Sequence, residues 1–287
     1  MLHAYCTRDF DALFCVTPVA PPLARLPVIS VVHDVTPLVM HRAFSPGTKA
    51  LLWSSIQTLR RADAVVTVSR HSRGDLARLG IVAPGKVFVV YPGIQNEPVA
   101  EQDPIGERYQ DFLLYVGSHK PNKNLRRLIA AFAGLRGHES LKLVIAGWDE
   151  ERYVVTTRRA AREFGVSDRV AILSEHLTRA QITSLYRASL GFVHPSLYEG
   201  FGSPLVEALA HGTPAACSST SSLPEVAGDA AIRFDATSVE DMRSKLRCLL
   251  DDQALRKHLR TSGPERARLY SWQQAARAVL DIARAVA

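Results

Sequence analysis

Cysteine is scarce in this sequence, and no two cysteines have a metal-binding spacing. The four cysteines stand at positions 6, 15, 217 and 248 and form no C-x-x-C motif. This pattern excludes a disulfide-rich scaffold and a zinc finger, and it is typical of reduced thiols in a cytosolic protein. Because no cluster of His and Cys ligands occurs either, we expect no metal site.

Long apolar runs are absent as well. No run reaches the ~18 residues of a membrane-spanning helix, because Arg or Pro interrupts every candidate. The amino end lacks the basic-then-apolar pattern of a signal peptide, so we expect a cytoplasmic protein. Basic residues do not alternate with aromatic ones, which argues against a nucleic-acid partner. The net charge of +7 suits an anionic substrate, peripheral contact with the inner face of an anionic membrane, or merely a solvated basic surface.

What the sequence does contain is a regular alternation of strand and helix patterns, which predicts an α/β fold with parallel sheets. β-branched apolar runs predict strands at 12–16, 28–33, 64–69, 87–91, 112–116, 141–146, 169–173, 190–194 and 214–217. Helical patterns lie near 47–61, 71–79, 124–135, 151–164, 178–188 and 204–211, with two more helices in 239–260 and one at 271–286.

The irregular, acidic stretch 98–104 is the best candidate for an interdomain linker. We therefore expect a partial amino-terminal Rossmann-like domain over 1–100 and a complete nucleotide-binding one over 101–268. The remaining segment, 269–287, is expected to be a helix that crosses back onto the first domain.

The stretch 194–207, His-Pro-Ser-Leu-Tyr-Glu-Gly-Phe-Gly-Ser-Pro-Leu-Val-Glu, carries the strongest functional signal. It places Glu199 and Glu207 on either side of a glycine turn and a helix start. Ser203 is the expected N-cap, with Pro204 at the first helical position. The unpaired N–H groups of such a helix start, together with its dipole, attract a phosphate. Two carboxylates beside a phosphate pocket suit a sugar nucleotide, which has hydroxyl groups on both sides of its diphosphate.

These residues resemble the Glu-x7-Glu motif of retaining GT-B glycosyltransferases, in particular glycosyltransferase family 4. The resemblance continues in family order through further segments, which are Val32-His33-Asp34, Tyr115-Val-Gly117, Lys120-Pro-Asn-Lys123-Asn-Leu, His211-Gly-Thr-Pro214, Ser222-Leu-Pro-Glu225 and Ser271-Trp272. It implies a GT-B fold, in which two Rossmann-like domains with parallel sheets face each other across a cleft that binds the donor.

The resemblance also implies roles for individual residues. The first glutamate, Glu199, would contact the transferred sugar, and Glu207 would contact the ribose. Lys123 would stabilise the leaving phosphate, and His33, at a strand end, would contact the sugar. The catalytic candidates are therefore His33, Lys123 and Glu199, and the donor-binding candidates are Gly117, Ser118, Lys123, Glu199, Gly200, Phe201, Gly202, Ser203 and Glu207. Hydroxyl groups of Thr220, Ser221 and Ser222 are further donor candidates.

One departure from the family pattern concerns the phosphate loop. Many members have an arginine just after the residue corresponding to Gly117 or later in the loop, whereas this chain has Ser118 and Asn122. Phosphate charge would then be met by Lys123, helped by Lys120 or His119.

The resemblance implies a hexosyltransferase. It would move mannose, glucose or galactose from a GDP- or UDP-linked donor to a saccharide or lipid-linked acceptor, with retention, without metal or other cofactor, in bacterial surface polysaccharide synthesis. The expected strands before residue 98 are fewer than the family's amino-terminal domain has, so the first part of that domain is expected to be missing. This leaves an alternative, a non-catalytic sugar-nucleotide-binding remnant or one half of a split transferase with an amino-terminal partner fragment.

Overall fold

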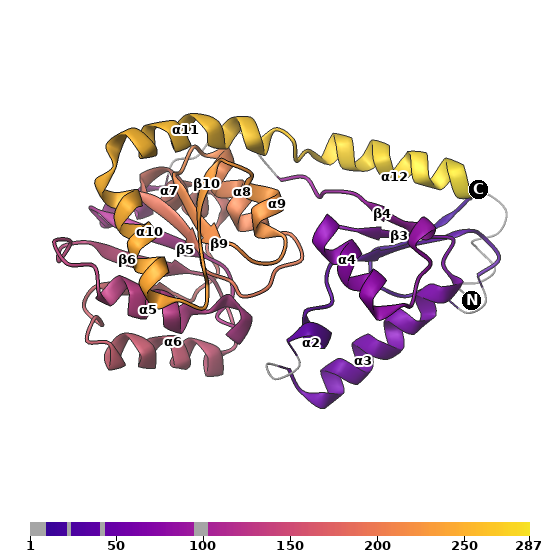
Figure 1. Ribbon diagram of the computed structural model, residues 1–287, viewed down its shortest axis with the longest axis horizontal. Coiled ribbons are helices and arrows are strands. Elements are labelled where there is room, and N and C mark those ends of the chain that lie inside the picture. Colours follow the sequence, from indigo (N-terminus) through magenta and orange to yellow (C-terminus); the bar gives the residue numbers. More distant parts are fainter. Residues whose placement is uncertain (1–9, 22–23, 41–43, 95–102) are drawn as a thin grey trace. The chain divides into compact units, whose positions relative to one another are not determined.

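The computed structural model describes residues 10–21, 24–40, 44–94 and 103–287. The chain folds as two compact units (Figure 1). Unit 1 contains Met1–Ile94, the short segment Glu199–Phe201 and Tyr270–Ala287, and unit 2 contains Gln95–Tyr198 and Gly202–Leu269. Each unit combines helices with a parallel sheet, so the expected α/β class is confirmed. Residues 98–102 of the expected linker lie outside the described part of the chain.

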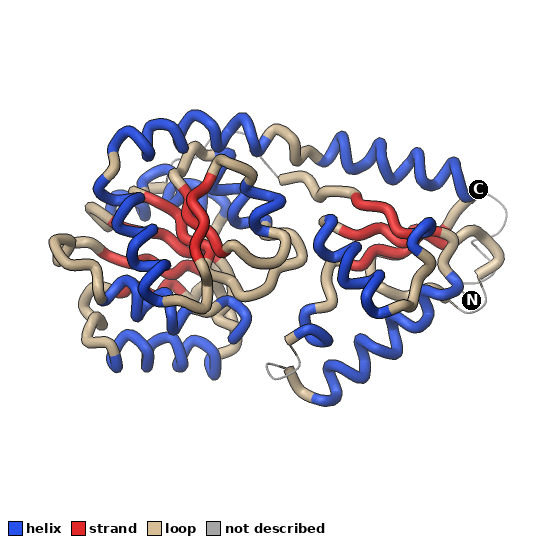
Figure 2. Tube along the Cα trace, viewed as in Figure 1, coloured by secondary structure: helices blue, strands red, loops and turns tan. Residues whose placement is uncertain are grey.

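Unit 1 contains a four-stranded parallel sheet with the order β1-β2-β3-β4 (Figure 2). Its elements are β1 (Leu13–Cys15), β2 (Val28–Val32), α2 (Thr36–Val39), α3 (Pro46–Gln57), the 3-10 turn η1 (Thr58–Arg61), β3 (Ala64–Thr67), α4 (Arg70–Leu79), the 3-10 turn η2 (Pro84–Lys86), β4 (Val87–Val89) and α12 (Trp272–Val286).

The β2 strand of unit 1 is buried on both faces, as its run Val-Ile-Ser-Val-Val, apolar except for Ser30, predicts. Successive side chains of a strand point to opposite faces. Val28 and Val32 accordingly belong to one core cluster with Ile56 of α3, and Ile29 packs in a second cluster with Ile282 of α12. Helix α12 therefore covers one face of this sheet, although it is the last element of the chain.

Unit 2 is built on a six-stranded parallel sheet with the order β10-β9-β8-β5-β6-β7. Its elements are η3 (Pro104–Arg108), β5 (Phe112–Val116), η4 (Pro121–Lys123), α5 (Leu125–Ala133), β6 (Lys142–Ala146), α6 (Glu151–Glu163), β7 (Val170–Leu173), α7 (Arg179–Ala188), β8 (Gly191–His194), α8 (Ser203–Ala210), β9 (Ala215–Ser218), α9 (Leu223–Ala227), β10 (Ala231–Phe234), α10 (Val239–Asp251) and α11 (Gln253–Ala267).

The main core cluster of unit 2 lies on one face of this sheet. Leu113 and Tyr115 of β5 pack there with side chains of α5, α6 and α10, among them Phe132 and Leu246. Two α-helices and one strand were not expected from the sequence, namely α2, α9 and β10. The run Ala-Ile-Arg-Phe of β10 is too short for the alternation of apolar and polar residues of a strand to be recognised.

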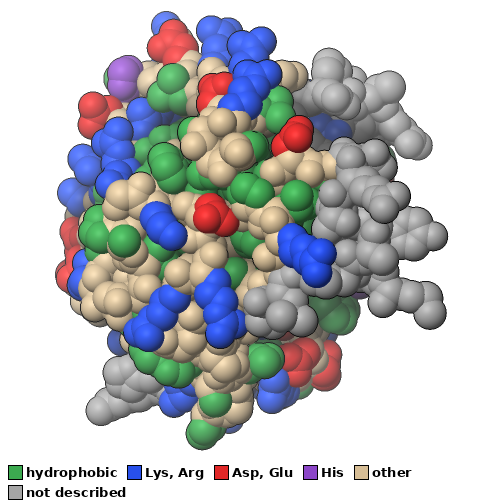
Figure 3. All heavy atoms as spheres, turned by 90° about the vertical axis from the view of Figure 1, so that its right-hand side faces the viewer, with side chains coloured by type: hydrophobic (Ala, Val, Ile, Leu, Met, Phe, Trp, Pro, Cys, Tyr) green, Lys and Arg blue, Asp and Glu red, His purple; other side chains and the backbone are tan. Residues whose placement is uncertain are grey.

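The surface of unit 1 carries charges of both signs. Figure 3 shows Lys and Arg side chains spread among apolar and acidic ones over the face that it presents. Arg60 and Arg61, at the end of η1, are exposed, as is Arg70 at the start of α4. Among the helices of the described residues, none has both the length and the apolar character needed to cross a membrane.

Candidate functional site

The strand order of unit 2 identifies where a ligand would bind. From β5 the chain adds β6 and β7 on one side, and from β8 it adds β9 and β10 on the other. Open α/β sheets bind ligands outside the carboxyl ends of the strands at such a reversal. The two loops that leave this point are 117–124, after β5, and 195–202, after β8. They contain Lys123 and Gly202, two of the candidate residues.

The loop after β5 begins with a glycine that is held by tight packing. Gly117 has φ +147°, and a Cβ atom there would lie 2.8 Å from the Tyr115 hydroxyl oxygen. That hydroxyl donates to the carbonyl oxygen of Ser118 at 2.7 Å. At the end of β6, Gly147 has φ +155°, and a Cβ there would lie 2.1 Å from the Gly117 carbonyl oxygen. Both positions therefore require glycine, and the two loops support each other.

His119 is buried, and its ring is fully engaged inside unit 2. Its Nε2 lies 3.1 Å from the Gly147 carbonyl oxygen, which can only accept, so Nε2 carries the proton. Its Nδ1 then accepts from the Thr157 hydroxyl at 2.9 Å. Burial lowers the pKa of His119, which agrees with this neutral form. The expectation that His119 helps to bind phosphate was therefore wrong, because both of its nitrogens have partners in the protein.

Lys123 ends η4 and is followed by an unusual asparagine. Asn124 has φ +60° and starts α5 without a side-chain cap. Its Nδ2 donates to the carbonyl oxygens of Pro195 at 3.0 Å and Ala236 at 2.8 Å, and its Oδ1 accepts from Arg127 at 3.0 Å. The amide thus joins the loop after β5 to the loop after β8.

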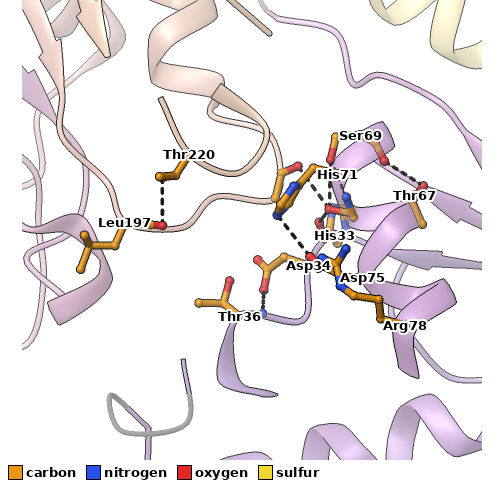
Figure 4. Close-up of polar contacts among 12 residues, drawn as sticks. His33, Asp34, Thr36, Thr67, Ser69, His71, Asp75, Arg78, Leu197 and Thr220 are labelled. Carbon is orange, nitrogen blue, oxygen red and sulfur yellow. Dashed lines mark hydrogen bonds and ion pairs between the residues drawn. The ribbon is translucent and has the colours of Figure 1, made fainter. Parts of the chain in front are cut away.

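A second group of bonds holds the loop after β8. The Leu197 N–H donates to the Asn122 carbonyl oxygen at 2.8 Å, and the Asn122 side chain donates to the Tyr198 carbonyl oxygen at 3.4 Å. The Thr220 hydroxyl donates to the Leu197 carbonyl oxygen at 3.1 Å (Figure 4). Thr220, which the sequence suggested as a contact to the nucleotide-sugar, therefore supports this loop with its hydroxyl.

Helix α8 begins one residue earlier than the sequence predicted. Its N-cap is Gly202, with φ +101°, so Ser203 is the first helical residue and Pro204 the second. The expectation that Ser203 is the N-cap was wrong, because the positive φ of Gly202 makes the turn itself. No acidic side chain occupies the first turn, so no carboxylate of that turn neutralises the positive end of this helix.

Glu207 lies one turn further along α8 and is held by a buried tyrosine of α7. The Tyr186 hydroxyl is 3.2 Å from Glu207 Oε2 and 3.2 Å from the Pro204 carbonyl oxygen. Burial raises the pKa of Glu207, while the bond from Tyr186 and the charge of Arg179 oppose this rise. Burial raises the pKa of Tyr186 well above its ordinary value, so its hydroxyl remains the donor.

The other candidates belong to unit 1, where His33 and Asp34 follow β2. The Thr36 N–H donates to Asp34 Oδ1 at 2.7 Å (Figure 4), and His33 Nε2 lies 3.2 Å from the Val16 carbonyl oxygen. A Cβ on Gly200 would lie 2.3 Å from the His33 carbonyl oxygen, so the two segments are in contact. The Ser72 hydroxyl lies 3.3 Å from the Gly200 carbonyl oxygen and joins α4 to this contact.

Phe201 is the aromatic anchor of this short segment. Its ring centroid lies 5.3 Å from that of Tyr270 and 6.3 Å from that of Tyr91, both in unit 1. Packing of these rings explains why the segment Glu199–Phe201 belongs to unit 1 although its neighbours in the chain belong to unit 2.

The candidate residues thus divide into two sets. Unit 2 holds Gly117, Ser118, Lys123, Gly202, Ser203 and Glu207, and unit 1 holds His33, Glu199, Gly200 and Phe201.

Sequence reasoning missed Tyr186, because an aromatic residue on a helix ordinarily signals core packing. It also missed Gly147, although a glycine directly after a buried strand was a usable signal. Within the described ranges we find no group of three or more His, Cys, Asp or Glu side chains that could hold a metal ion.

Comparison with known families and sequences agrees with this geometry. The model of the family Glycosyl transferases group 1 matches residues 101–266, and that of Glycosyltransferase Family 4 matches residues 2–97. O-antigen chain mannosyltransferase B of Escherichia coli is 30% identical over 230 residues, which cover 76% of this chain and 59% of that protein. MMP alpha-(1->4)-mannosyltransferase of Mycolicibacterium hassiacum is 29% identical over 221 residues, 76% of this chain and 53% of that protein. The chain thus spans little more than half the length of these relatives.

Solved structures share the fold. Anabaena Alr3699/HepE, in complex with UDP and glucose, superposes with a TM-score of 0.80 at 17% identity, over 95% of this chain and 77% of that one. WaaG, a glycosyltransferase involved in lipopolysaccharide biosynthesis, gives a TM-score of 0.77 at 19% identity, over 96% of this chain and 78% of that one. The chain therefore has the GT-B type of α/β fold that the sequence predicted.

Proposed function

The chain belongs to the glycosyl transferases group 1 family, and on that premise we propose that it transfers a hexosyl group from a nucleotide-sugar to a saccharide or lipid-linked acceptor. Mannose is the first sugar to test, because the relatives quoted above are mannosyltransferases. The donor would be GDP- or UDP-linked; the UDP bound by HepE supports a nucleoside diphosphate. Synthesis of a bacterial surface polysaccharide is the proposed setting, since one relative acts on O-antigen chains.

The observation that carries this proposal is that Lys123 and the start of α8, which has no acidic side chain in its first turn, belong to the two loops that leave the strand-order reversal of unit 2. Cleavage of the sugar–diphosphate bond places negative charge on the leaving phosphate. Fixed positive groups stabilise such charge without reorganising during the reaction. Lys123 would supply a full charge, and the amides of Ser203 and its neighbours the positive end of a helix. This arrangement is the basis for proposing a metal-independent reaction.

The two glutamates would select the hydroxyl groups on either side. Glu207 is partly buried beside Tyr186, whose proton favours the carboxylate form, so it suits a ribose hydroxyl. Glu199 and His33 would contact the transferred sugar. Their segments meet in unit 1, where Gly200 packs on the carbonyl of His33. Retention of anomeric configuration is part of the proposal and is tested on the product.

A second candidate function is nucleotide-sugar binding without transfer, as a remnant or half of a split transferase. It is favoured by the edge of the unit 1 sheet. Among the described strands β1 is paired on one side only, and Phe14 on it and Val16 just after it are 44% and 63% exposed. Apolar side chains on a free strand edge are typical of a surface that pairs with another strand.

One experiment separates the two functions. The purified chain is incubated with GDP-mannose or UDP-glucose, and release of nucleoside diphosphate is measured for the wild type, Glu199→Gln and the control Glu240→Gln, whose carboxylate is exposed on α10. The transferase proposal requires turnover, with the hexosyl group passing to water when no acceptor is supplied, that Glu199→Gln abolishes and Glu240→Gln leaves unchanged. Nucleotide binding without turnover, restored by a fragment that completes the β1 edge, would select the second candidate. Absence of nucleotide binding would refute both.

A further inference from the structure

A hollow of about 510 Å³ lies on unit 2 between the start of α5 and the first turns of α6. Its walls come from the loop residues His119–Pro121, the α5 start Asn124–Arg127, and α6 residues between Arg152 and Thr157. Lys123, Glu207 and the other donor-binding candidates of unit 2 are not in this lining, whereas Lys120 and His119, named above as helpers of Lys123, are. The volume is within the range of pockets that hold small organic ligands.

The lining of this hollow is strongly biased in charge. Four of its side chains are cationic, namely Lys120, Arg126, Arg127 and Arg152, and none of the residues that line it is Asp or Glu. A pocket of this kind raises the local concentration of anions. The four cations also repel each other, and an anion bound between them would reduce this repulsion.

Ion pairs at its rim leave these cations available. Arg126 pairs with Glu163 and Arg152 pairs with Glu150, but the side chains of Arg126 and Arg152 are 59% and 67% exposed. Exposed pairs of this kind contribute little and exchange partners readily. Arg127 donates to a neutral amide oxygen, that of Asn124, and Asp235, the carboxylate whose pKa its charge lowers, is not in the lining.

The remaining lining suits a ligand that has hydroxyl groups as well as phosphate. Tyr153 contributes a phenol, and the Arg152 guanidinium lies over its ring at 4.7 Å, which favours this position of the cation. The hydroxyl of Thr156 is also in the lining. The first turn of α5 adds the positive end of a helix without a side-chain cap or an acidic residue.

From these charges and this volume we propose that the hollow is a second anion site, which takes a small phosphorylated molecule with at least two negative charges. It is distinct from the donor site of Lys123 and the start of α8, it assigns Lys120 to the hollow rather than to the donor phosphate, and it does not depend on the chain's being a transferase. A bound phosphate would lie among Lys120, Arg127 and Arg152, and the hydroxyl-bearing part of the ligand would lie against Tyr153.

The test uses inorganic pyrophosphate as the probe and isothermal titration calorimetry of the full chain at low salt. The variant Arg126→Glu/Arg152→Glu reverses two exposed cations of the lining. The control Arg158→Glu/Arg247→Glu makes the same change in net charge outside the hollow, and melting temperatures verify that both variants fold. Each titration is repeated with GDP at saturation, so that the donor site is occupied.

We expect the wild type and the control to bind pyrophosphate with and without GDP, and the lining variant to bind it at least tenfold more weakly. Equal affinity of the two double variants would overturn the proposal, because the attraction would then be a property of the net charge. Displacement of pyrophosphate by GDP would also overturn it, since one site would then account for both ligands. So would the absence of measurable binding at millimolar pyrophosphate.

Discussion

Removal of one buried hydroxyl tests how Glu207 is held. In Tyr186→Phe the ring keeps its packing against Phe192 and His211, at centroid distances of 5.6 Å each, while the oxygen that lies 3.2 Å from Glu207 Oε2 is lost. The Tyr186 side chain is 1% exposed, so water does not replace the hydroxyl without entering the core. The substitution therefore removes the hydroxyl's hydrogen bond to the Glu207 carboxylate together with its contact to the Pro204 carbonyl oxygen.

The magnitude follows from the charge of the acceptor. A hydrogen bond to a charged group contributes about 1.5–3 kcal/mol, so Tyr186→Phe should lower the free energy of unfolding by about 2 kcal/mol at neutral pH. For a unit of this size that corresponds to a decrease in melting temperature of about 4–8 °C. The bond also lowers the pKa of Glu207, so its loss raises that pKa further.

The sign of the pH dependence is fixed by this shift. Burial raises the pKa of Glu207 in the folded protein above 4.5, its ordinary value. The folded state therefore holds this proton to higher pH than the unfolded chain, and the free energy of unfolding falls as the pH rises from 4.5 through the folded-state pKa. Tyr186→Phe should extend this fall to higher pH.

The assay is urea unfolding of the wild type, Tyr186→Phe, Glu207→Gln and the double variant, with Tyr153→Phe as a control that removes a less buried hydroxyl. We expect a coupling energy of about 1–2 kcal/mol between Tyr186 and Glu207. A Tyr186→Phe protein as stable as the control, or a coupling energy of zero, would refute the view that this hydroxyl positions the carboxylate.

Three further predictions concern other positions. Burial, with the charges of Arg187 and Arg179, lowers the pKa of His211 from 6.5 to about 4, so the free energy of unfolding should fall as the pH drops through that range. His211→Gln should reduce the slope of this free energy against pH, measured by thermal unfolding, by up to about 1.4 kcal/mol per pH unit, and an unchanged slope would show that other groups cause the loss of stability in acid. Gly147→Ala should lower the free energy of unfolding in urea by about 3 kcal/mol or more, because the new Cβ would meet a backbone oxygen. Gly165→Ala is the control, with φ +68° and no atom within 4 Å, and should lower it by about 1 kcal/mol; equal losses would contradict the contact at Gly147. Ser69→Ala removes the N-cap of α4, whose oxygen accepts from the Ser72 N–H at 3.0 Å, and should cost about 1 kcal/mol by the same measurement, an unchanged value meaning that the helix start is held by other contacts.

The order of strands and helices was largely predictable, because apolar residues recur at every second position in a strand and about every 3.6 positions in a helix, and both periods can be recognised in one sequence. In β2 a run of five buried residues leaves little ambiguity. The start of α8 was misplaced by one residue, since Ser203 has the composition of an N-cap and only the backbone angle of Gly202 shows where the turn ends.

The candidate site was predictable in part, as a set of segments but not as a set of contacts. Gly117 and Lys123 stand in recognisable positions after a strand, so their location in the loop that follows β5 could be predicted from the pattern. The engagement of His119 with Thr157 did not, because 38 positions separate the two residues and no local pattern links them. The same holds for Tyr186, whose partner Glu207 is on another helix.

The side chain of Asn124 has a consequence for how this chain can evolve. Its two amide protons serve two carbonyl groups from separate loops, and its backbone has a positive φ. Aspartate would tolerate that angle but direct an oxygen at two other oxygens, glycine would adopt the angle and donate nothing, and glutamine would reach too far. None of these three residues replaces both functions of Asn124, so changes in the surrounding loops must keep their two carbonyl groups within its reach.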